Sequence, residues 1–318
     1  MTSVLLVAES DDRGSIGQPT LQAIEAAKRL TDPEITVVIV GDLPSLASSL
    51  PVGRVLRISK VDECDVGIYE QATNDISEII NQFHPDVVLF NRSDFGSLVG
   101  PRVAFRLGVV FASDCTEFSN AEGSIVVTRP VFGGSALADF EVATLQCVIT
   151  LRSGSFPANT ETGNPSIEEF TSNVIVDQRA WVLDTMAESR EGVRLEDANV
   201  IVSGGRGLGG PEPFSILHDL ANVLDGAVGA SRAACDAGWI DHAYQVGLTG
   251  KSVSPDVYIA VGISGASQHM AGCSSSRAIV AINKDADSNI FKEARYGVVG
   301  DWEKVLPAFL SAVREIKS

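Results

Sequence analysis

Continuous apolar runs alternate with amphipathic segments through the first ninety residues of the chain. The runs have the aliphatic composition of parallel strands that are buried on both faces. They are Ser3–Ala8, Ile35–Val40 and Asp86–Phe90. Pro19 stands at a favourable first helical position after the first run, and residues 76–83 place apolar side chains on one helix face. Strands that alternate with helices favour a parallel sheet with crossover helices.

The pattern changes after residue 124, where strand-like segments follow one another without helices between them. Ser124–Arg129 and Val142–Leu151 are expected to be strands, whereas Arg152–Pro165 is polar and typical of a loop. Ser166–Arg190 has a mixed character and is expected to cover a domain junction, with a boundary near residues 189–195.

The last third of the chain returns to alternating strands and helices. Its expected strands are Ala198–Ser203, Asp256–Val261 and Ala278–Ile282, and its clearest helix faces lie in residues 214–224 and 306–313. A chain of 318 residues is expected to have two domains at roughly 150 residues each. We therefore predict an α/β fold of two doubly wound, mainly parallel-sheet domains, residues 1–190 and 191–318.

Composition and charge exclude several classes of protein. Hydrophobic residues make up 45% of the chain and charged residues 20%, as in ordinary globular domains, and the formal net charge is −17. Residues 1–190 carry 26 acidic and 13 basic side chains, a net of −13, and residues 191–318 carry 15 and 11, a net of −4. Phosphate neutralisation needs clustered Lys and Arg, so no nucleic-acid partner is expected, and an anionic membrane surface is disfavoured on the same ground.

Targeting signals and metal-binding patterns are not apparent. No apolar run reaches the roughly 18 residues of a membrane-spanning helix, so no membrane insertion is expected. The N-terminus enters a strand pattern at once, which indicates a cytoplasmic chain or one already processed. The five cysteines form no CxxC pair and fit reduced thiols. The four histidines show no metal-ligand spacing, so no metal is expected, but His269 follows a Gly-rich loop directly.

Gly205–Gly210 matches the GxGxxG pattern directly after a predicted strand. Glycines at these positions let backbone N–H groups approach a pyrophosphate at a helix N-terminus. Pro211 and Pro213 delay the helix, however, which a dinucleotide fingerprint would begin at once. A flexible Gly turn without a ligand therefore stays open as an alternative, although Arg206 inside the loop favours a phosphate ligand.

Two further motifs resemble catalytic loops and fail on inspection. Gly247–Ser252 looks like the end of a Walker A loop, but Gln245 stands where the first glycine is required, and Pro255 replaces the expected helix. Gly262–Ala266 resembles a hydrolase nucleophile elbow around Ser264, but the order of serine, acid and histidine that this chemistry needs is missing. The second loop is expected instead to be a tight βα connection or a second anion site.

Five ordered blocks in the last third resemble the alpha subunit of electron-transfer flavoproteins. The blocks are Ser203–Leu208, Gly229–Gly238, Gly247–Lys251, Tyr258–Gly272 and Ile279–Asp285. The longest block, YIAVGISGASQHMAG, is close to diagnostic. The first domain is a weaker match, through its opening strand and the Gly96–Arg102 stretch.

The resemblance implies that the second domain binds FAD. Carried over by position, the residues that would line FAD are Arg206, Ser231, Val246, Gly247, Leu248, Thr249, Ser264, Gly265, Ala266, Ser267, Gln268, His269, Asn283, Asp301 and Trp302. Arg206 and the Ser264 turn would face the pyrophosphate, and Asn283 the ribitol or adenosine. Arg232 and His269 would favour a reduced, negatively charged flavin. His269 is expected to be neutral, because the positive end of a helix dipole disfavours its protonation.

The resemblance also implies a role as an electron carrier without substrate chemistry of its own. The partner would be a beta subunit that lies against the first domain and carries AMP or a second FAD. Electrons would come from a dehydrogenase such as acyl-CoA dehydrogenase, as in fatty acid beta-oxidation, and pass to a membrane or soluble acceptor oxidoreductase of a respiratory chain. An electron-bifurcating system is also compatible with the sequence.

Three departures from the family pattern bear on the flavin potential. Leu248 stands where the family has Gln, Ser267 stands where it has Ile, and the prolines usual after Lys284-Asp285 are missing. Two other functions stay open. An NAD-dependent oxidoreductase could use Gly205–Gly210 with Asp225 as the acid about twenty residues on, and a nucleotide-binding structural subunit would have no redox role.

Overall fold

The computed structural model describes residues 2–9, 16–58, 68–121, 124–134, 136–143, 146–172, 193–196 and 198–317. Its elements form two compact units, Met1–Pro130 with Leu137–Glu188, and Val131–Ala136 with Ser189–Ser318. Most of the expected domain junction lies outside the described residues, and so does Cys64, one of the five cysteines. Among the described residues, no helix is both long and apolar enough to cross a membrane.

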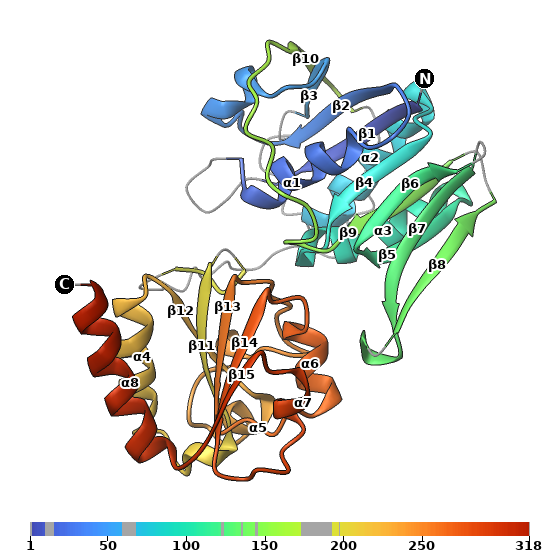
Figure 1. The fold of residues 1–318 in the computed structure, drawn as a ribbon. Helices are drawn as coiled ribbons and strands as arrows, with labels where there is room; N and C mark the ends of the chain where they lie inside the picture. The colour runs from blue at the N-terminus through green and yellow to red at the C-terminus, as the bar shows by residue number, and fades with distance from the viewer. Residues whose placement is uncertain are drawn as a thin grey trace. The chain divides into compact units, whose positions relative to one another are not determined.

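A seven-stranded sheet of order β10-β3-β2-β1-β4-β9-β5 forms the centre of the first unit (Figure 1). Every strand pair in it is parallel. The strands are β1 (Thr2–Ala8), β2 (Pro33–Val40), β3 (Arg54–Ile58), β4 (Val87–Asn91), β5 (Val110–Cys115), β9 (Cys147–Leu151) and β10 (Ser166–Phe170).

Both faces of this sheet are covered, which is why its strands are apolar throughout. In β1, Val4 and Leu6 join one hydrophobic cluster with Ile24 of helix α1 (Gln18–Ala27). Leu5 and Val7 point to the other face, which is covered by helices α2 (Ile68–Phe83) and α3 (Asp94–Leu107). The apolar residues predicted at 76–83 are the ones α2 buries there.

The segment after β5 forms a second, three-stranded sheet of order β6-β7-β8. Its strands are β6 (Glu117–Ala121), β7 (Ser124–Val131) and β8 (Ala136–Val142), and the 3₁₀ turn η2 (Phe132–Gly134) lies between β7 and β8. Another 3₁₀ turn, η1 (Ser45–Ser49), lies between β2 and β3. The single strand expected over Val142–Leu151 is wrong, because β8 ends at Val142 and β9, in a different sheet, begins at Cys147. A continuous apolar run does not show where the chain passes from one sheet to another.

The segment expected to be a junction begins with a strand. β10 pairs in parallel with β3 at the edge of the large sheet, although its sequence, SIEEF, has no continuous apolar run. An edge strand has one neighbour and exposed side chains, so the hydrophobic pattern that marks buried strands is absent there. The exact domain boundary stays a prediction.

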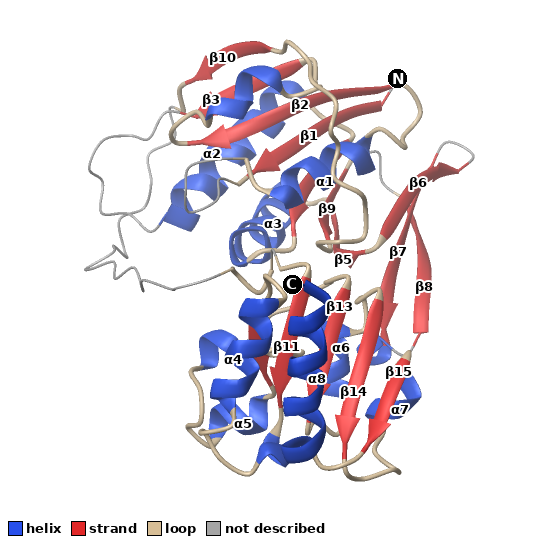
Figure 2. Cartoon of the chain, turned by 60° about the vertical axis from the view of Figure 1, so that its left-hand side comes forward, coloured by secondary structure: helices blue, strands red, loops and turns tan. Residues whose placement is uncertain are grey.

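A five-stranded parallel sheet of order β12-β11-β13-β14-β15 forms the centre of the second unit (Figure 2). Its strands are β11 (Val200–Gly204), β12 (Ala227–Ala230), β13 (Val257–Val261), β14 (Ala278–Asn283) and β15 (Tyr296–Val299). The chain leaves β11 to form β12 on one side and returns to form β13 on the other. The carboxyl ends of β11 and β13 therefore meet at a topological switch point, where such sheets bind ligands.

Helices cover both faces of this second sheet (Figure 1). Helices α4 (Phe214–Val223) and α8 (Trp302–Lys317) pack on one face through Leu217 and Leu306, and α6 (Ser267–Cys273) and α7 (Ile290–Glu293) pack on the other. The remaining short elements are α5 (Arg232–Asp236), η3 (Arg206–Leu208) and η4 (His242–Tyr244). The predicted architecture of two α/β domains with mainly parallel sheets is confirmed.

Gly96 gives a direct test of the packing in the first unit. A Cβ atom at this position would lie 2.0 Å from the Asn91 carbonyl oxygen, whereas one at Gly53 would lie 3.8 Å from its nearest neighbour. We expect Gly96→Ala to lower the free energy of unfolding by about 1–3 kcal/mol, as overpacking of a buried site does. Urea unfolding measures it, with Gly53→Ala as the near-neutral control; equal midpoints for the two variants would contradict the described helix–strand contact.

Candidate functional site

The candidate site is built on a close contact between the loops that follow β11 and β13. Gly207 N–H donates a hydrogen bond to the Gly262 carbonyl at 3.0 Å. A Cβ atom on Gly205 would lie 2.3 Å from the same oxygen, and one on Gly207 would lie 2.8 Å from it. Only glycine allows this approach, and Gly262 itself has a φ of 64°, in the region that favours glycine. Arg206 is held between these glycines, at the switch point.

The loops around this contact enclose a pocket of about 730 Å³, within the range of small-molecule and cofactor sites. Twelve of the residues expected at the cofactor line it: Arg206, Ser231, Arg232, Val246, Gly247, Leu248, Thr249, Ser264, Ala266, Gln268, His269 and Asn283. They come from the ends of four parallel strands and from the 245–251 loop. The structure thus brings together residues that are up to 77 positions apart in the sequence (206 to 283).

The other four expected residues do not line the pocket. Gly265 and Ser267 belong to the same β13–α6 turn as the lining residues; Gly265 has a φ of 76°, and a Cβ atom there would lie 2.2 Å from the Ile290 backbone nitrogen. Asp301 accepts a hydrogen bond from the Glu303 N–H at the start of α8, as a helix cap does. Trp302 packs against the apolar cluster under α8.

Sequence reasoning missed several lining residues, of which Asp236 and Gln245 carry the most informative polar side chains. The others are Gly207, Ala233, Gly262, Ile263, Asp285 and Ser288. Gln245 lies two residues before the block that begins at Gly247, and Asp236 lies inside the Gly229–Gly238 block. Their position beside recognised blocks was the available signal.

The 245–251 loop is fixed in shape by its own backbone and by α6. Leu248 N–H donates to the Gln268 carbonyl at 2.7 Å, and Lys251 N–H donates to the Gln245 carbonyl at 2.8 Å. A Cβ atom on Gly272 of α6 would lie 2.4 Å from the Gly247 nitrogen, so two glycines permit the contact. Leu248 is exposed by 56% on the pocket wall, where it offers an apolar surface in place of a polar one.

The pocket carries two arginines in different electrostatic surroundings. Arg206 makes no ion pair with any described residue, so its charge is available to an anionic ligand. Arg232 Nε lies 3.3 Å from Asp236 Oδ2, four residues further along α5, and both side chains are largely exposed. An exposed pair of this kind contributes little to stability, but it compensates part of the positive charge at that end of the pocket.

His269 is buried at the base of the pocket and lies against Tyr258. Its Nε2 is 3.0 Å from the Tyr258 hydroxyl, and no described residue forms a hydrogen bond with Nδ1 by distance and angle. Burial lowers the pKa of His269 to about 4, against a weaker opposite influence of the Val246 backbone, so the ring is neutral at pH 7. The expectation of a neutral His269 is right, but burial is the main cause and not the dipole of the short α6.

The other polar side chains of the pocket differ in whether they form hydrogen bonds with described residues. Ser231 Oγ is buried and has no hydrogen-bond partner among the described residues. Asn283, by contrast, donates to the Ile263 carbonyl at 2.9 Å and to Ser288 Oγ at 3.2 Å. It therefore braces the two loops that follow β13 and β14. Unsatisfied buried atoms are uncommon in folded proteins, so Ser231 Oγ and His269 Nδ1 point to a bound group.

The structure also bears on the Walker-like motif and on the alternative of an NAD-dependent oxidoreductase. Lys251 of the Walker-like segment pairs with Glu196 and does not line the pocket. Asp225 precedes β12, at the opposite end of the strand from Ser231, and pairs with Lys317 at 2.6 Å. An acid that holds a dinucleotide ribose has to stand at the carboxyl end of that strand. The described residues contain no cluster of three or more metal-ligating side chains.

Together these features define an α/β protein with a cofactor-sized pocket at the switch point of its second sheet. The family model described as "Electron transfer flavoprotein domain" matches residues 4–174, and the one described as "Electron transfer flavoprotein FAD-binding domain" matches residues 194–274. The chain belongs to the electron transfer flavoprotein alpha subunit family, and the cofactor of its C-terminal domain is FAD.

Curated relatives agree with this assignment over most of the chain. The electron transfer flavoprotein subunit alpha of Bacillus subtilis is 36% identical over 318 residues, which cover 98% of each chain. The subunit alpha of Thermoanaerobacterium thermosaccharolyticum is 43% identical over 252 residues, or 76% of this chain and 75% of the relative. That of Megasphaera elsdenii is 36% identical over 331 residues, or 99% and 97% of the two chains.

The residues present in the pocket fit FAD. An arginine with no acidic partner among the described residues suits a pyrophosphate, and the first N–H groups of α6 have no intrahelical acceptor. Leu248 and Val246 offer apolar wall to a ring system. The two unsatisfied buried atoms, Ser231 Oγ and His269 Nδ1, offer hydrogen bonds to its heteroatoms.

The buried neutral His269 makes stability depend on pH. The unfolded histidine binds a proton near its ordinary pKa of 6.5, whereas the folded one does so only near 4. Its contribution is therefore complete above pH 6.5 and is lost as the pH falls towards 4, by about 2 kcal/mol between pH 7 and 5. Urea unfolding at several pH values should show a shallower decline for His269→Gln than for the parent, and His218→Gln, at an exposed histidine outside the pocket of about 730 Å³, is the control variant. Parallel slopes for His269→Gln and the parent would contradict the burial of a neutral ring.

Proposed function

We propose that the chain is the FAD-carrying subunit of a two-subunit electron carrier. It accepts electrons from a dehydrogenase, such as an acyl-CoA dehydrogenase of fatty acid beta-oxidation, and passes them to a membrane or soluble acceptor oxidoreductase. The observation that carries the proposal is the pocket at the β11–β13 switch point, with Arg206, which pairs with no described residue, and two buried polar atoms that no described residue satisfies. The family assignment supports the same role.

Bound FAD supplies the capacity to take up and release electrons, and the chain's residues hold and tune it. Arg206 and the loop around Ser264 offer positive charge and N–H donors to the pyrophosphate. Asn283 holds two pocket loops in register through its amide. Ser231 and His269 donate or accept hydrogen bonds at the base of the pocket, where low dielectric strengthens each interaction.

The pocket is suited to a carrier more than to an enzyme with substrate chemistry. Ser264 is the most nucleophile-like residue of the turn, but the nearby His269 contacts the Tyr258 hydroxyl through Nε2. Burial raises the pKa of Tyr258 well above its usual value, so this hydroxyl keeps its proton. A neutral, buried pair of this kind is suited to hold a ring in place and not to exchange protons with a substrate.

A beta subunit that lies against the first unit and carries AMP or a second FAD completes the proposed carrier. Support comes from large apolar side chains that the first unit leaves exposed: Phe105 by 88%, Leu137 by 67% and Phe140 by 46%. Phe105 belongs to α3, and the other two belong to β8. Exposed aromatic and aliphatic groups of this size commonly mark a protein interface.

Arg206 tests the proposed FAD site. We expect Arg206→Ala to weaken FAD binding about 10- to 100-fold, because one charge-assisted interaction contributes about 1.5–3 kcal/mol. FAD fluorescence titration of the reconstituted protein measures the affinity, and Arg206→Lys should restore part of it. Arg277→Ala is the matched control, because Arg277 is 81% exposed and precedes β14, at the opposite end of the sheet. A purified parent protein without the yellow flavin band would contradict the proposal outright.

Arg232 and Asp236 should change the reduction potential of bound FAD in opposite directions. A cation near the ring favours the added negative charge, so Arg232→Ala should lower the potential and Arg232→Lys should keep part of it. Asp236→Asn removes the acid that compensates Arg232 and should raise the potential. Stepwise dithionite reduction against a reference dye measures the values. If both variants shift the potential in the same direction, the electrostatic account of this end of the pocket is wrong.

A further inference from the structure

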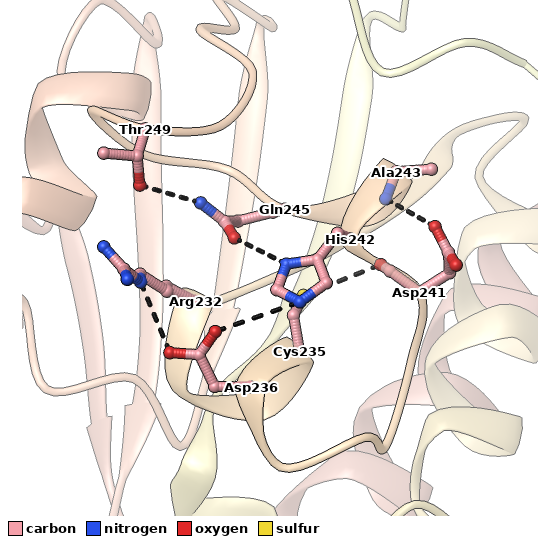
Figure 3. Close-up of polar contacts among 8 residues, drawn as sticks. All are labelled: Arg232, Cys235, Asp236, Asp241, His242, Ala243, Gln245 and Thr249. Carbon is pink, nitrogen blue, oxygen red and sulfur yellow. Dashed lines mark hydrogen bonds and ion pairs between the residues drawn. The ribbon is translucent and has the colours of Figure 1, made fainter.

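Five side chains form a continuous line of polar contacts from Arg232 to Thr249 (Figure 3). Arg232 Nε lies 3.3 Å from Asp236 Oδ2, and Asp236 Oδ1 lies 3.9 Å from His242 Nε2. His242 Nδ1 lies 3.1 Å from Gln245 Oε1, and Gln245 Nε2 lies 3.0 Å from Thr249 Oγ1. Both ends of the line belong to the pocket wall, but His242 does not.

Gln245 is the centre of this arrangement because its amide is buried and its acceptor end and donor end face different neighbours. The side chain is 5% exposed, and its backbone carbonyl anchors the 245–251 loop through Lys251 N–H. An amide oxygen accepts hydrogen bonds and an NH₂ group donates them. With Oε1 facing His242, that ring nitrogen carries the hydrogen, and Nε2 donates to the Thr249 hydroxyl oxygen.

The orientation of Thr249 follows from that donation. Its oxygen already accepts a hydrogen bond from Gln245, so the hydroxyl hydrogen is directed away from Gln245. Thr249 is exposed on the pocket wall, where an acceptor atom of a bound ligand can receive that hydrogen. If the Gln245 amide were turned by 180°, Thr249 would donate to Gln245 and lose this capacity.

His242 is held in the position that sets the amide. It opens η4, where the Asp241 carboxylate caps the turn by accepting the Ala243 N–H at 2.7 Å. The contact from Nε2 to Asp236 is too long for a hydrogen bond, so the stronger polar contact of the ring is the one to Gln245. His242 is 65% exposed, so replacing it removes little packing.

We propose that Gln245 and His242 are positioning residues that hold the Thr249 hydroxyl as a hydrogen-bond donor to bound FAD. The inference rests on the proposed function, because it takes FAD as the occupant of the pocket. A donor at a ring acceptor stabilises the negative charge that reduction adds, so this line of contacts raises the reduction potential. His242 thus acts on the cofactor from outside the pocket.

The test is a double-mutant cycle on the full flavin-loaded protein, read by the reduction potential of FAD and by its affinity. Thr249→Val removes the hydroxyl and should lower the potential and weaken binding about 2- to 10-fold, as expected for one neutral hydrogen bond. His242→Asp places an acceptor where the ring donates, turns the Gln245 amide and should shift both quantities in the same direction as Thr249→Val. His242→Asn keeps a donor of similar reach and should match the parent.

The decisive variant combines Thr249→Val with His242→Asp. If His242 acts through Thr249, the second substitution adds no shift in the Thr249→Val background. A shift that persists there would reveal a direct effect of the new negative charge and overturn the inference. An unchanged potential in either single variant would overturn it as well. A parent protein that binds no FAD refutes the proposed function, and the inference with it, whereas a flavin-loaded parent with additive variants refutes the inference alone.

Discussion

The glycine contact between the loops after β11 and β13 determines the geometry of everything else in the second unit. The Gly262 carbonyl accepts the Gly207 N–H, and there is no room for a side chain at Gly205 or Gly207. The two loops held at this distance line the pocket at the carboxyl ends of the central strands, whereas the helices pack on the two faces of the sheet. Arg206 then lies just after the carboxyl end of β11 and has no ion-pair partner among the described residues. Water can solvate this charge, but an anionic ligand compensates it better.

Successive layers of contacts build the pocket around that point. The 245–251 loop lies on α6 through Gly247 and Gly272, and Asn283 ties the loops that follow β13 and β14. The base is formed by buried side chains, so His269 is neutral, and among the described residues none forms a hydrogen bond with its Nδ1. Charge at the rim and unsatisfied hydrogen-bonding capacity at the base are complementary to a ligand that has a pyrophosphate and a heteroaromatic ring.

Much of this could be predicted from the sequence, and the remainder could not for physical reasons. Continuous apolar runs predicted β1, β2, β4, β11, β13 and β14, because central parallel strands are buried on both faces. The same signal failed for β10, whose edge position leaves its acidic residues in water, and for Val142–Leu151, where one apolar run spans two sheets. Twelve of the sixteen expected site residues line one pocket. Asp236 and Gln245 were missed although each lies only four residues from its partner, Arg232 or Thr249, because sequence spacing alone does not show which side chains face the pocket.

The central claim is that FAD occupies the switch-point pocket of the second unit, and a crystal structure of the flavin-loaded protein tests it most directly. The account predicts electron density for the pyrophosphate beside Arg206 and the Ser264 turn, with the ring reaching the Thr249 hydroxyl and with Ser231 Oγ and His269 Nδ1 each within hydrogen-bond distance of the cofactor. Density for FAD elsewhere on the chain, or a cofactor that leaves Arg206 and both buried atoms without contacts, would contradict it.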